Sequence, residues 1–276
     1  MRGRLWRLTV PDQPIRGAYL SLGEDWAALV RERGYSPDQA ALLGQAMAAM
    51  PLLLSRLKAD VKLNLQISQA DPLRLLAVQG GSDGRLRGLV KSEGESLDVS
   101  ALSGQLVVTM ESMDGRQTYQ GIVALDGAGP AQWLARYFDQ SEQLDTRLIL
   151  VADEHQAGGV LLQAMPGERA DIDWQAAMEA IDIDVLPPEP GEWLSIMLGC
   201  DLQLAGEVDA VDIHCGCDAQ AVSGMLFGLG EAEVQGILAE QGAVTVECGF
   251  CGHEYRFGAD EVAALFAQGD RPSVVH

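Results

Sequence analysis

Two pairs of closely spaced cysteines are the residues of this 276-residue sequence best suited to chemistry. The pairs are Cys215-Gly-Cys217 and Cys248-Gly-Phe-Cys251, with thirty residues between them. A Cys-x-x-Cys turn directs two thiolates at one ion, and a second pair brought alongside completes a tetrahedral shell of four sulfurs. The spacing therefore predicts one Zn²⁺ ion bound by all four cysteines. Metal-free packing of all four thiols is disfavoured, because side chains two or three residues apart do not all point into a core.

Bound zinc would also set the reactivity of these cysteines. A zinc-bound sulfur is a thiolate, which is the species that oxidants attack. The site is therefore expected to be both a structural clamp and a redox trigger. His214 and His253 flank the cysteines and offer alternative ligands, although four sulfurs already complete the shell. Cys200 has no close partner and is expected to be a small packed side chain.

The elements around the four cysteines are expected to form a small C-terminal zinc-binding domain, residues 214–276. Helices are predicted from Asp218 through Leu226 and over 231–240. Strands at 244–247 and 253–257 and a last helix capped by Asp260 follow. A hydrophobic core alone is marginal in a segment of roughly sixty residues. Metal binding is therefore expected to contribute much of the folding free energy of this domain.

Residues 1–166 alternate strand-like and helix-like segments and are expected to form an N-terminal core domain. Ser36 followed by Pro37 predicts the start of a helix that continues through Met50, and a second helix is predicted over 129–137. Apolar runs of strand length lie at 62–67, 73–78, 105–110, 119–125 and 147–152, with a turn-like GGSDG run at 80–84. Short connections between them predict an α+β fold with a mostly antiparallel sheet.

An acidic linker is predicted over residues 167–213. Between 167 and 190 it has seven acidic residues against Arg169 alone, and three prolines end this stretch. Trp174, Ala177, Met178 and Ile181 share one face of a short amphipathic helix, which would need a surface to lie on. A second apolar run, Trp193 to Leu198, follows the prolines.

The charge of the chain argues against several partners. Lys and Arg number 19 against 40 Asp and Glu, which gives a formal net charge of −21, and residues 214–276 have two basic residues against nine acidic ones. Such a surface repels the phosphates of nucleic acids and anionic lipids, so neither a nucleic-acid-binding zinc ribbon nor a membrane protein is expected.

Compartment is predicted from the N-terminus, the apolar runs and the cysteines. The most apolar stretch, Ala40 to Leu54, is shorter than the roughly 20 residues of a membrane span and contains Gln45 and Pro51. The N-terminus lacks the apolar core of a signal peptide. The cysteines are confined to the last third of the chain, unlike a disulfide framework. A cytoplasmic protein is therefore expected.

Longer motifs resemble a known family. EYRF follows the four-cysteine pattern at 254–257. Upstream lie YQGIVAL at 119–125, ARYFDQSEQLDT at 135–146 and AGGVLLQAMPG at 157–167. Together these motifs give the chain, from Ile15 to Phe266, a sequence that resembles the redox-regulated heat-shock chaperones of about thirty-three kilodaltons.

The resemblance implies an ATP-independent holdase, not an enzyme, that protects proteins under oxidative and heat stress. By this similarity the reduced, zinc-bound protein is an inactive monomer. Oxidation then pairs Cys215 with Cys217 and Cys248 with Cys251, releases zinc and unfolds the zinc domain and linker. The active form is a homodimer whose exposed apolar surface binds unfolding proteins. The apolar residues expected to reach solvent are Trp174, Met178, Ile181, Trp193, Ile196 and Met197.

The sequence departs from the family pattern near the switch. The segment Met197-Leu198-Gly199-Cys200-Asp201 stands where the family usually has a Leu-Phe-His-Glu-like segment, and residues 218–220 replace a usual Ser and Arg. These differences concern the docking of the linker and the reactivity of the thiols, not the metal site.

The stretch 167–190 and the zinc segment carry net charges of −6 and −7. This acidity is expected to favour their unfolding and to keep the opened protein soluble.

Two enzymatic alternatives rest on fewer residues. A thiol-disulfide oxidoreductase would use Cys248 and Cys251, but it needs a βαβ context and a helix N-terminus at the first thiol, whereas Cys248 is predicted to follow a strand. Acyl transfer by Ser55 and Lys58 rests on a four-residue match in a predicted helix. The sequence has no Walker loop, His-Glu-x-x-His or Gly-x-Gly-x-x-Gly motif.

Overall fold

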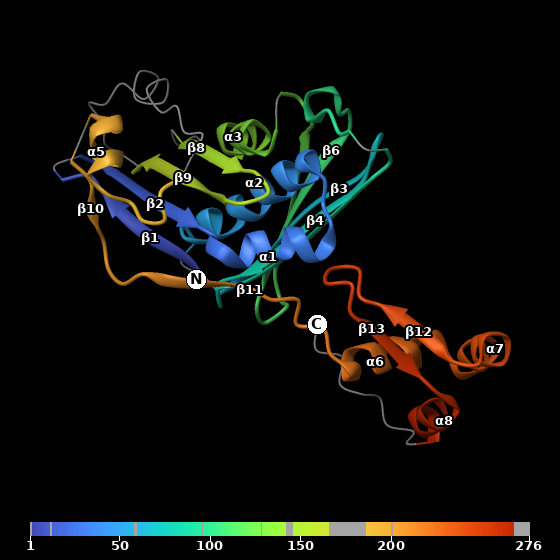
Figure 1. Cartoon of the computed structure of the whole chain (residues 1–276). Coiled ribbons are helices and arrows are strands. Elements are labelled where there is room, and N and C mark those ends of the chain that lie inside the picture. The colour runs from blue at the N-terminus through green and yellow to red at the C-terminus, as the bar shows by residue number, and fades with distance from the viewer. Residues whose placement is uncertain are drawn as a thin grey trace. The chain divides into compact units, whose positions relative to one another are not determined.

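An 11-stranded sheet is the scaffold of the first of two units in the computed structural model of this chain (Figure 1). The structure describes residues 2–11, 13–57, 60–94, 96–127, 129–141, 146–165, 186–199 and 201–267. Contacts divide the chain into Met1–His214 and Cys215–His276. The three-part division drawn from the sequence stays a prediction, since most of the acidic stretch lies outside the described residues.

The sheet of the first unit runs in the order β7-β6-β3-β4-β5-β11-β1-β2-β9-β8, and β10 also pairs with β1. Neighbouring strands are antiparallel, except that β11 runs parallel to β5. The strands are β1 (Gly3–Thr9), β2 (Ile15–Ser21), β3 (Val61–Ala70), β4 (Leu73–Gly81), β5 (Arg85–Ser92), β6 (Gln105–Ser112), β7 (Thr118–Ala124), β8 (Thr146–Ala152), β9 (Ala157–Ala164), β10 (Gln203–Leu204) and β11 (Asp209–Ile213). The expected α+β fold is confirmed.

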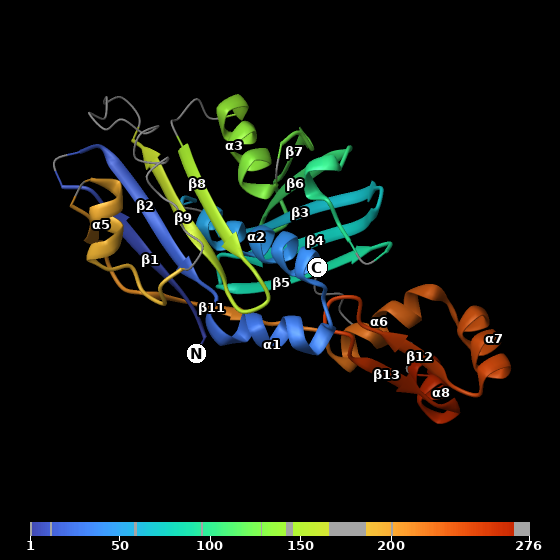
Figure 2. The ribbon, with the colours of Figure 1, turned by 45° about the horizontal axis from the view of Figure 1, so that its top comes forward.

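Helix α2 (Pro37–Leu54) forms the centre of the main core. Its start follows the prediction: the Ser36 hydroxyl accepts from the Gln39 N–H, the Gln39 side chain accepts from the Ser36 N–H, and Pro37 is the first helical residue. The helix packs against β9, β4, β5 and β8, and Figure 2 shows it lying along the sheet. Because sheet surrounds it, nearly its whole length is apolar, and it runs four residues past the predicted end despite Pro51.

The other described helices of the first unit lie on both faces of the sheet. Helix α1 (Gly23–Arg33) and helix α3 (Pro130–Ser141) add Trp26 and Trp133 to the same core as α2. A 3-10 turn, η1 (Val99–Ala101), precedes β6. Helix α5 (Glu192–Leu198) contributes Leu194 to a second core on the opposite face, where it meets Trp6 of β1 and Tyr19 of β2.

Two strands form inside the segment predicted as linker. Strands β10 and β11 pair with β1, and β11 also pairs with β5. Neither strand has a strong apolar pattern of its own, because β10 has two residues and β11 has five. Their structure depends on edges provided by strands far away in sequence. This part of the predicted linker therefore belongs to the first unit.

The second unit is a small assembly of helices and one hairpin. Its elements are α6 (Ala219–Leu229), α7 (Glu231–Gln241), β12 (Val244–Glu247), β13 (Glu254–Phe257) and α8 (Ala259–Ala267). Asp218 caps α6 as predicted, by accepting from the Ala221 N–H at 2.6 Å. Asp260 instead lies in the first turn of α8, which begins one residue earlier. The buried apolar core consists of Val222, Leu226, Val234, Val244, Phe257 and Val262.

Candidate metal centre

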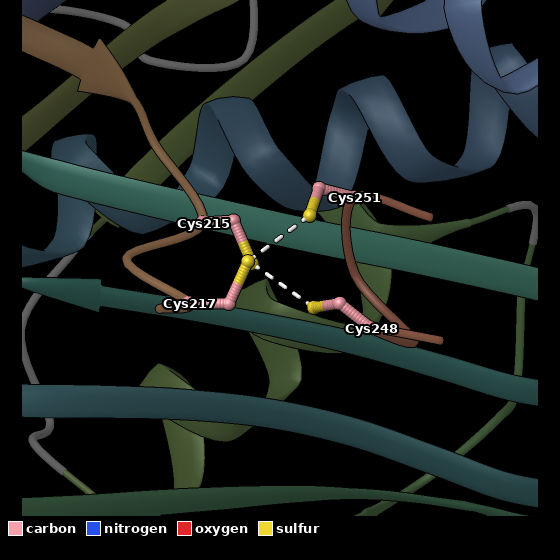
Figure 3. A group of neighbouring side chains, drawn as sticks. All are labelled: Cys215, Cys217, Cys248 and Cys251. Carbon is pink, nitrogen blue, oxygen red and sulfur yellow. Dashed lines mark hydrogen bonds between the residues drawn. The ribbon is translucent and has the colours of Figure 1, made fainter. Parts of the chain in front are cut away.

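Four cysteine sulfurs converge in the second unit (Figure 3). Their Sγ atoms all lie within 4.8 Å of one another. The Sγ atoms of Cys215 and Cys248 are 3.3 Å apart, as are those of Cys217 and Cys251. In a tetrahedral zinc site with Zn–S bonds of ~2.3 Å, the sulfurs lie about 3.8 Å apart. The four cysteines are therefore close enough to hold one metal ion, in agreement with the spacing of the sequence.

The first cysteine pair follows directly after strand β11. The His214 N–H donates to the Leu86 carbonyl at 2.9 Å and continues the pairing of β11 with β5 by one residue. Gly216 has a φ of 66°, a left-handed conformation that glycine adopts readily, and it lets the chain turn between the two cysteines. Asp218 then caps helix α6. A strand end and a helix start thus fix both ends of the short Cys-x-Cys segment.

The second cysteine pair lies in the turn between β12 and β13. The Cys248 N–H donates to the His253 carbonyl at 2.9 Å, and the Gly252 N–H donates to the Cys248 carbonyl at 2.8 Å. Gly252 has a φ of 73° and so closes the turn without strain. The last strand pair, Glu247 with Glu254, lies just before these bonds. The hairpin therefore presents Cys248 and Cys251 from one rigid turn.

Tyr255 is a contact of the site that the sequence did not reveal. Its hydroxyl donates to the Cys217 Sγ at 3.2 Å, and its ring packs edge-on against His253 with centroids 4.6 Å apart. The predicted strand at 253–257 did not reveal this partner, because Cys217 lies 38 residues away in the sequence. The histidines themselves are exposed, and the metal-compatible group found among the described residues consists of the four cysteines.

The thiols of the site differ in acidity. Burial and a hydrogen bond with Cys248 raise the pKa of Cys215. Burial also opposes ionisation of Cys248, but the N–H groups of Cys251 and Phe250 and the Cys215 thiol donate to its sulfur and lower its pKa to about 7. Burial raises the pKa of Cys251. Of these three thiols, Cys248 is therefore the best prepared to ionise.

Comparison with known proteins decides the family. A family model described as Hsp33 protein matches residues 3–258. The chain belongs to the Hsp33 family. The 33 kDa chaperonin of Nitrosococcus oceani is 34% identical over 276 residues, covering 97% of this chain and 95% of the relative. The 33 kDa chaperonin of Pseudomonas putida is 34% identical over 280 residues, covering 95% and 93%.

A solved Hsp33 structure has the same fold. The crystal structure of the 33 kDa chaperonin from Thermotoga maritima matches with a TM-score of 0.80 at 21% identity, covering 97% of this chain and 99% of that chain. The resemblance inferred from the motifs is thus confirmed. Because the relatives are named chaperonins, the chain is assigned to the chaperones and not to the enzymes.

The residues expected to bind clients in this Hsp33 family member fall into two groups. Trp174, Met178 and Ile181 lie outside the described residues, as do Cys200 and the side chain of Met197. Trp193 is partly buried, and its ring lies 5.9 Å from that of Tyr19. Ile196 is 77% exposed. Of the described candidates, only Trp193 is therefore covered in this structure.

The two enzymatic alternatives find little support in the geometry. Cys248 follows strand β12 and lies in a hairpin turn, not at the N-terminus of a helix. The Ser55 hydroxyl donates to the Leu52 carbonyl at 2.7 Å at the end of α2, and Lys58 lies outside the described residues.

Among the described residues, no helix is both long and apolar enough to cross a membrane.

Proposed function

We propose that this protein is a redox-regulated, ATP-independent holdase that binds unfolding proteins after its cysteines are oxidised. The observation that carries the proposal is the cluster of four sulfurs within 4.8 Å, in a chain of the Hsp33 family. The family supports the chaperone activity. The cluster supports a switch in which a metal site and a pair of disulfides exclude each other.

Cys215, Cys217, Cys248 and Cys251 would hold the metal, and Zn²⁺ is the ion that four thiolates favour. A bound ion would join the Cys-x-Cys segment to the β12–β13 turn, whose sulfurs lie within 4.8 Å of one another. Among the described residues of the second unit, the core cluster has six buried apolar side chains, which is small for independent stability. We therefore expect metal binding to contribute much of the folding free energy of this unit.

Oxidation by hydrogen peroxide converts the ligands into disulfides. One thiolate of a pair attacks the peroxide and becomes a sulfenic acid, with release of hydroxide. The second thiolate attacks the sulfenic sulfur, forms the S–S bond and displaces a second hydroxide. Two protons convert the hydroxides to water. Two peroxide molecules thus oxidise all four thiolates, and the four cysteines would then no longer hold Zn²⁺, because a disulfide sulfur is a poor ligand.

The disulfide pairing within the proposal is Cys215 with Cys217 and Cys248 with Cys251. In the reduced geometry, sulfur separations of 3.3 Å join Cys215 to Cys248 and Cys217 to Cys251. All four sulfurs nevertheless lie within 4.8 Å, so small rotations of the side chains reach either pairing. Mapping the disulfides of the oxidised protein by mass spectrometry distinguishes the two.

Loss of the metal is expected to unfold the second unit and loosen the preceding linker. Trp174, Met178, Ile181, Trp193, Ile196 and Met197 are the proposed apolar residues that then face clients, because flexible and aromatic side chains suit promiscuous binding. We propose a monomer when reduced, a homodimer when oxidised, and a cytoplasmic location, where thiols stay reduced in the absence of stress.

One experiment tests the function. Protein purified under reduction is assayed for zinc and free thiols, oxidised with hydrogen peroxide at raised temperature, and mixed with a thermally unfolding client. We expect one zinc and reduced site cysteines at the start, then zinc loss together with suppressed aggregation. Zinc loss without suppression, or no zinc loss, contradicts the proposal. Catalytic reduction of insulin by the Cys248 and Cys251 pair would instead favour the oxidoreductase.

A further inference from the structure

Strand β11 joins two parts of the first unit's sheet (Figures 1 and 2). On one side it pairs with β1, from Gly3 opposite Val211 to Leu5 opposite Asp209. On the other side it pairs with β5 through Asp212 and Ile213. Among the described residues, the other strand on this edge of β1 is β10, which pairs at Leu8 and Thr9. Removal of β11 would therefore leave the pairing edges of β1 and β5 on either side of an empty space, here called the slot.

Both walls of the slot carry a glycine where the backbone of β11 comes closest. A Cβ atom on Gly3 of β1 would lie 2.9 Å from the Val211 carbonyl oxygen. A Cβ atom on Gly84, which has a φ of 79° in the turn before β5, would lie 2.7 Å from the Ala210 carbonyl oxygen. Both distances are too short for a side chain. The slot is thus shaped to admit the backbone of an extended segment.

A cavity of about 270 Å³ lies beside β11 within the first unit. Met50 and Leu54 of α2 and Leu5 of β1 contribute apolar lining, and residues 209–211 of β11 complete it. Val211 is buried in the same core cluster as Leu5, and the Asp209 carboxylate pairs with Arg7. Successive side chains of a strand alternate between faces, so every second residue of an occupant meets this cavity.

The far end of β11 leads into the first cysteine pair. The last strand residue, Ile213, is followed by His214, whose N–H bonds to Leu86, and then by Cys215. A metal at the cysteines would therefore hold the end of a strand that pairs with β5 at only two positions. Without that metal, β11 would be held only by its short pairing with β1 and β5.

We propose that oxidation withdraws β11 and that the slot between β1 and β5 then binds an extended apolar segment of a client as an added strand. This inference rests on the proposed function. Strand β11 shows which occupant fits: an extended segment with a β-branched apolar side chain at the Val211 position and a carboxylate two residues earlier, facing Arg7. Backbone pairing supplies most of the recognition, so many client sequences are accepted.

A peptide copy of β11 tests the slot in the full-length protein. A fluorescent peptide of residues 205–214 is titrated against the reduced, zinc-loaded protein and against the oxidised protein. We expect the oxidised protein to bind at least about tenfold more tightly. The same peptide carrying Val211→Asp should bind about tenfold more weakly, because a carboxylate would replace a side chain that is buried in the apolar core. Saturating peptide should abolish the suppression of client aggregation.

The outcomes separate this inference from the proposed function. If the oxidised protein suppresses aggregation but neither binds the peptide nor is inhibited by it, the slot is not the client site and the holdase stands. If oxidised protein fails to suppress aggregation, the holdase fails, and peptide binding alone then decides whether the slot opens. Peptide that dissociates an oxidised dimer without affecting client binding assigns the slot to a second copy and overturns the proposal.

A variant of the protein provides an independent test. Val211→Asp should expel β11 without oxidation, so the reduced protein should bind the peptide while its zinc and thiol contents are unchanged. Val208→Asp is the matched control, because Val208 is exposed and precedes the strand. Equal peptide binding by the two reduced variants contradicts the proposal. If Val211→Asp does not fold, the titration of the unaltered protein still decides it.

Discussion

The hydroxyl of Tyr255 donates a hydrogen bond to the Sγ atom of Cys217 across 3.2 Å. The contact joins strand β13 to the first cysteine pair, which comes from a distant part of the chain. It also raises the pKa of the Tyr255 hydroxyl, because the phenol donates to the Cys217 sulfur and the neighbouring cysteines add negative charge. A donor held against a thiolate stabilises its charge and lowers its nucleophilicity. Tyr255 is therefore placed to slow the oxidation of Cys217.

Tyr255→Phe should consequently speed the redox response. A hydrogen bond to a charged group contributes about 1.5–3 kcal/mol at most, and the partial exposure of this site reduces that value. We expect zinc release under hydrogen peroxide to become about three- to tenfold faster, as followed with a zinc-binding dye. Tyr119→Phe is the control, since Tyr119 is half exposed on β7. An unchanged rate would show that the hydroxyl does not protect Cys217.

Cys248→Ser tests the four-sulfur assignment. A serine hydroxyl is a poor zinc ligand, so three sulfurs and an open position remain. We expect zinc affinity, measured by competition with a chelating dye, to fall by more than the roughly 10- to 100-fold typical of losing an outer-sphere partner. The reduced variant should already suppress client aggregation in part.

The matched control for that variant is Cys200→Ser, which removes a thiol that the sequence does not assign to the cluster. It should leave zinc stoichiometry and reduced-state activity unchanged. Tight, stoichiometric zinc in Cys248→Ser would refute the assignment of four sulfur ligands.

Features encoded by neighbouring residues could be predicted from the sequence. The Ser36 and Gln39 capping pair fixes the start of α2, and two short cysteine spacings place four sulfurs together once the hairpin forms. Strand β11 could not be predicted, because its pairing is determined by β1 and β5, which lie far away in the chain. The contact of Tyr255 with Cys217 was missed for the same reason. Local patterns predicted the cluster of four cysteines, whereas the strand that leads into it required the structure.

Leu194→Ala should loosen the end of the linker from the sheet. Leu194 is fully buried on α5 and belongs to a core cluster with Tyr19, whose hydroxyl donates to the Pro187 carbonyl. Truncation of a buried leucine costs about 2–5 kcal/mol. We expect limited proteolysis of the reduced, zinc-loaded protein to cut at 186–199 at least tenfold faster. Ile196 lies on the same helix but is exposed, so the Ile196→Ala variant should be cut at the rate of the unaltered protein. Equal cleavage rates for the two variants would contradict the docking of α5 through Leu194.

The predicted linker, residues 167–213, contains acidic residues that form an ion pair and acidic residues that do not. Neutralising the two kinds is expected to have opposite effects on oxidative activation. From the sequence, the acidity of the stretch 167–190 is expected to favour unfolding, so neutralising acids there should raise the threshold for oxidative activation. Asp209 instead pairs with Arg7 and helps to hold β11, whereas Glu207 is exposed and makes no ion pair among the described residues. Asp209→Asn should therefore lower the peroxide concentration for half-maximal activation, while Glu207→Gln should leave it equal or higher.

The size and salt dependence of these shifts identify their electrostatic origin. Exposed ion pairs contribute about 0–1 kcal/mol, so the Asp209→Asn shift should not exceed about fivefold. Because roughly 1 M salt shortens the screening length to about 3 Å, the difference between the two variants should shrink when activation is measured at high salt. A shift of equal sign in both variants would mean that the total acidity of the linker, and not the contact of Asp209 with Arg7, sets the threshold.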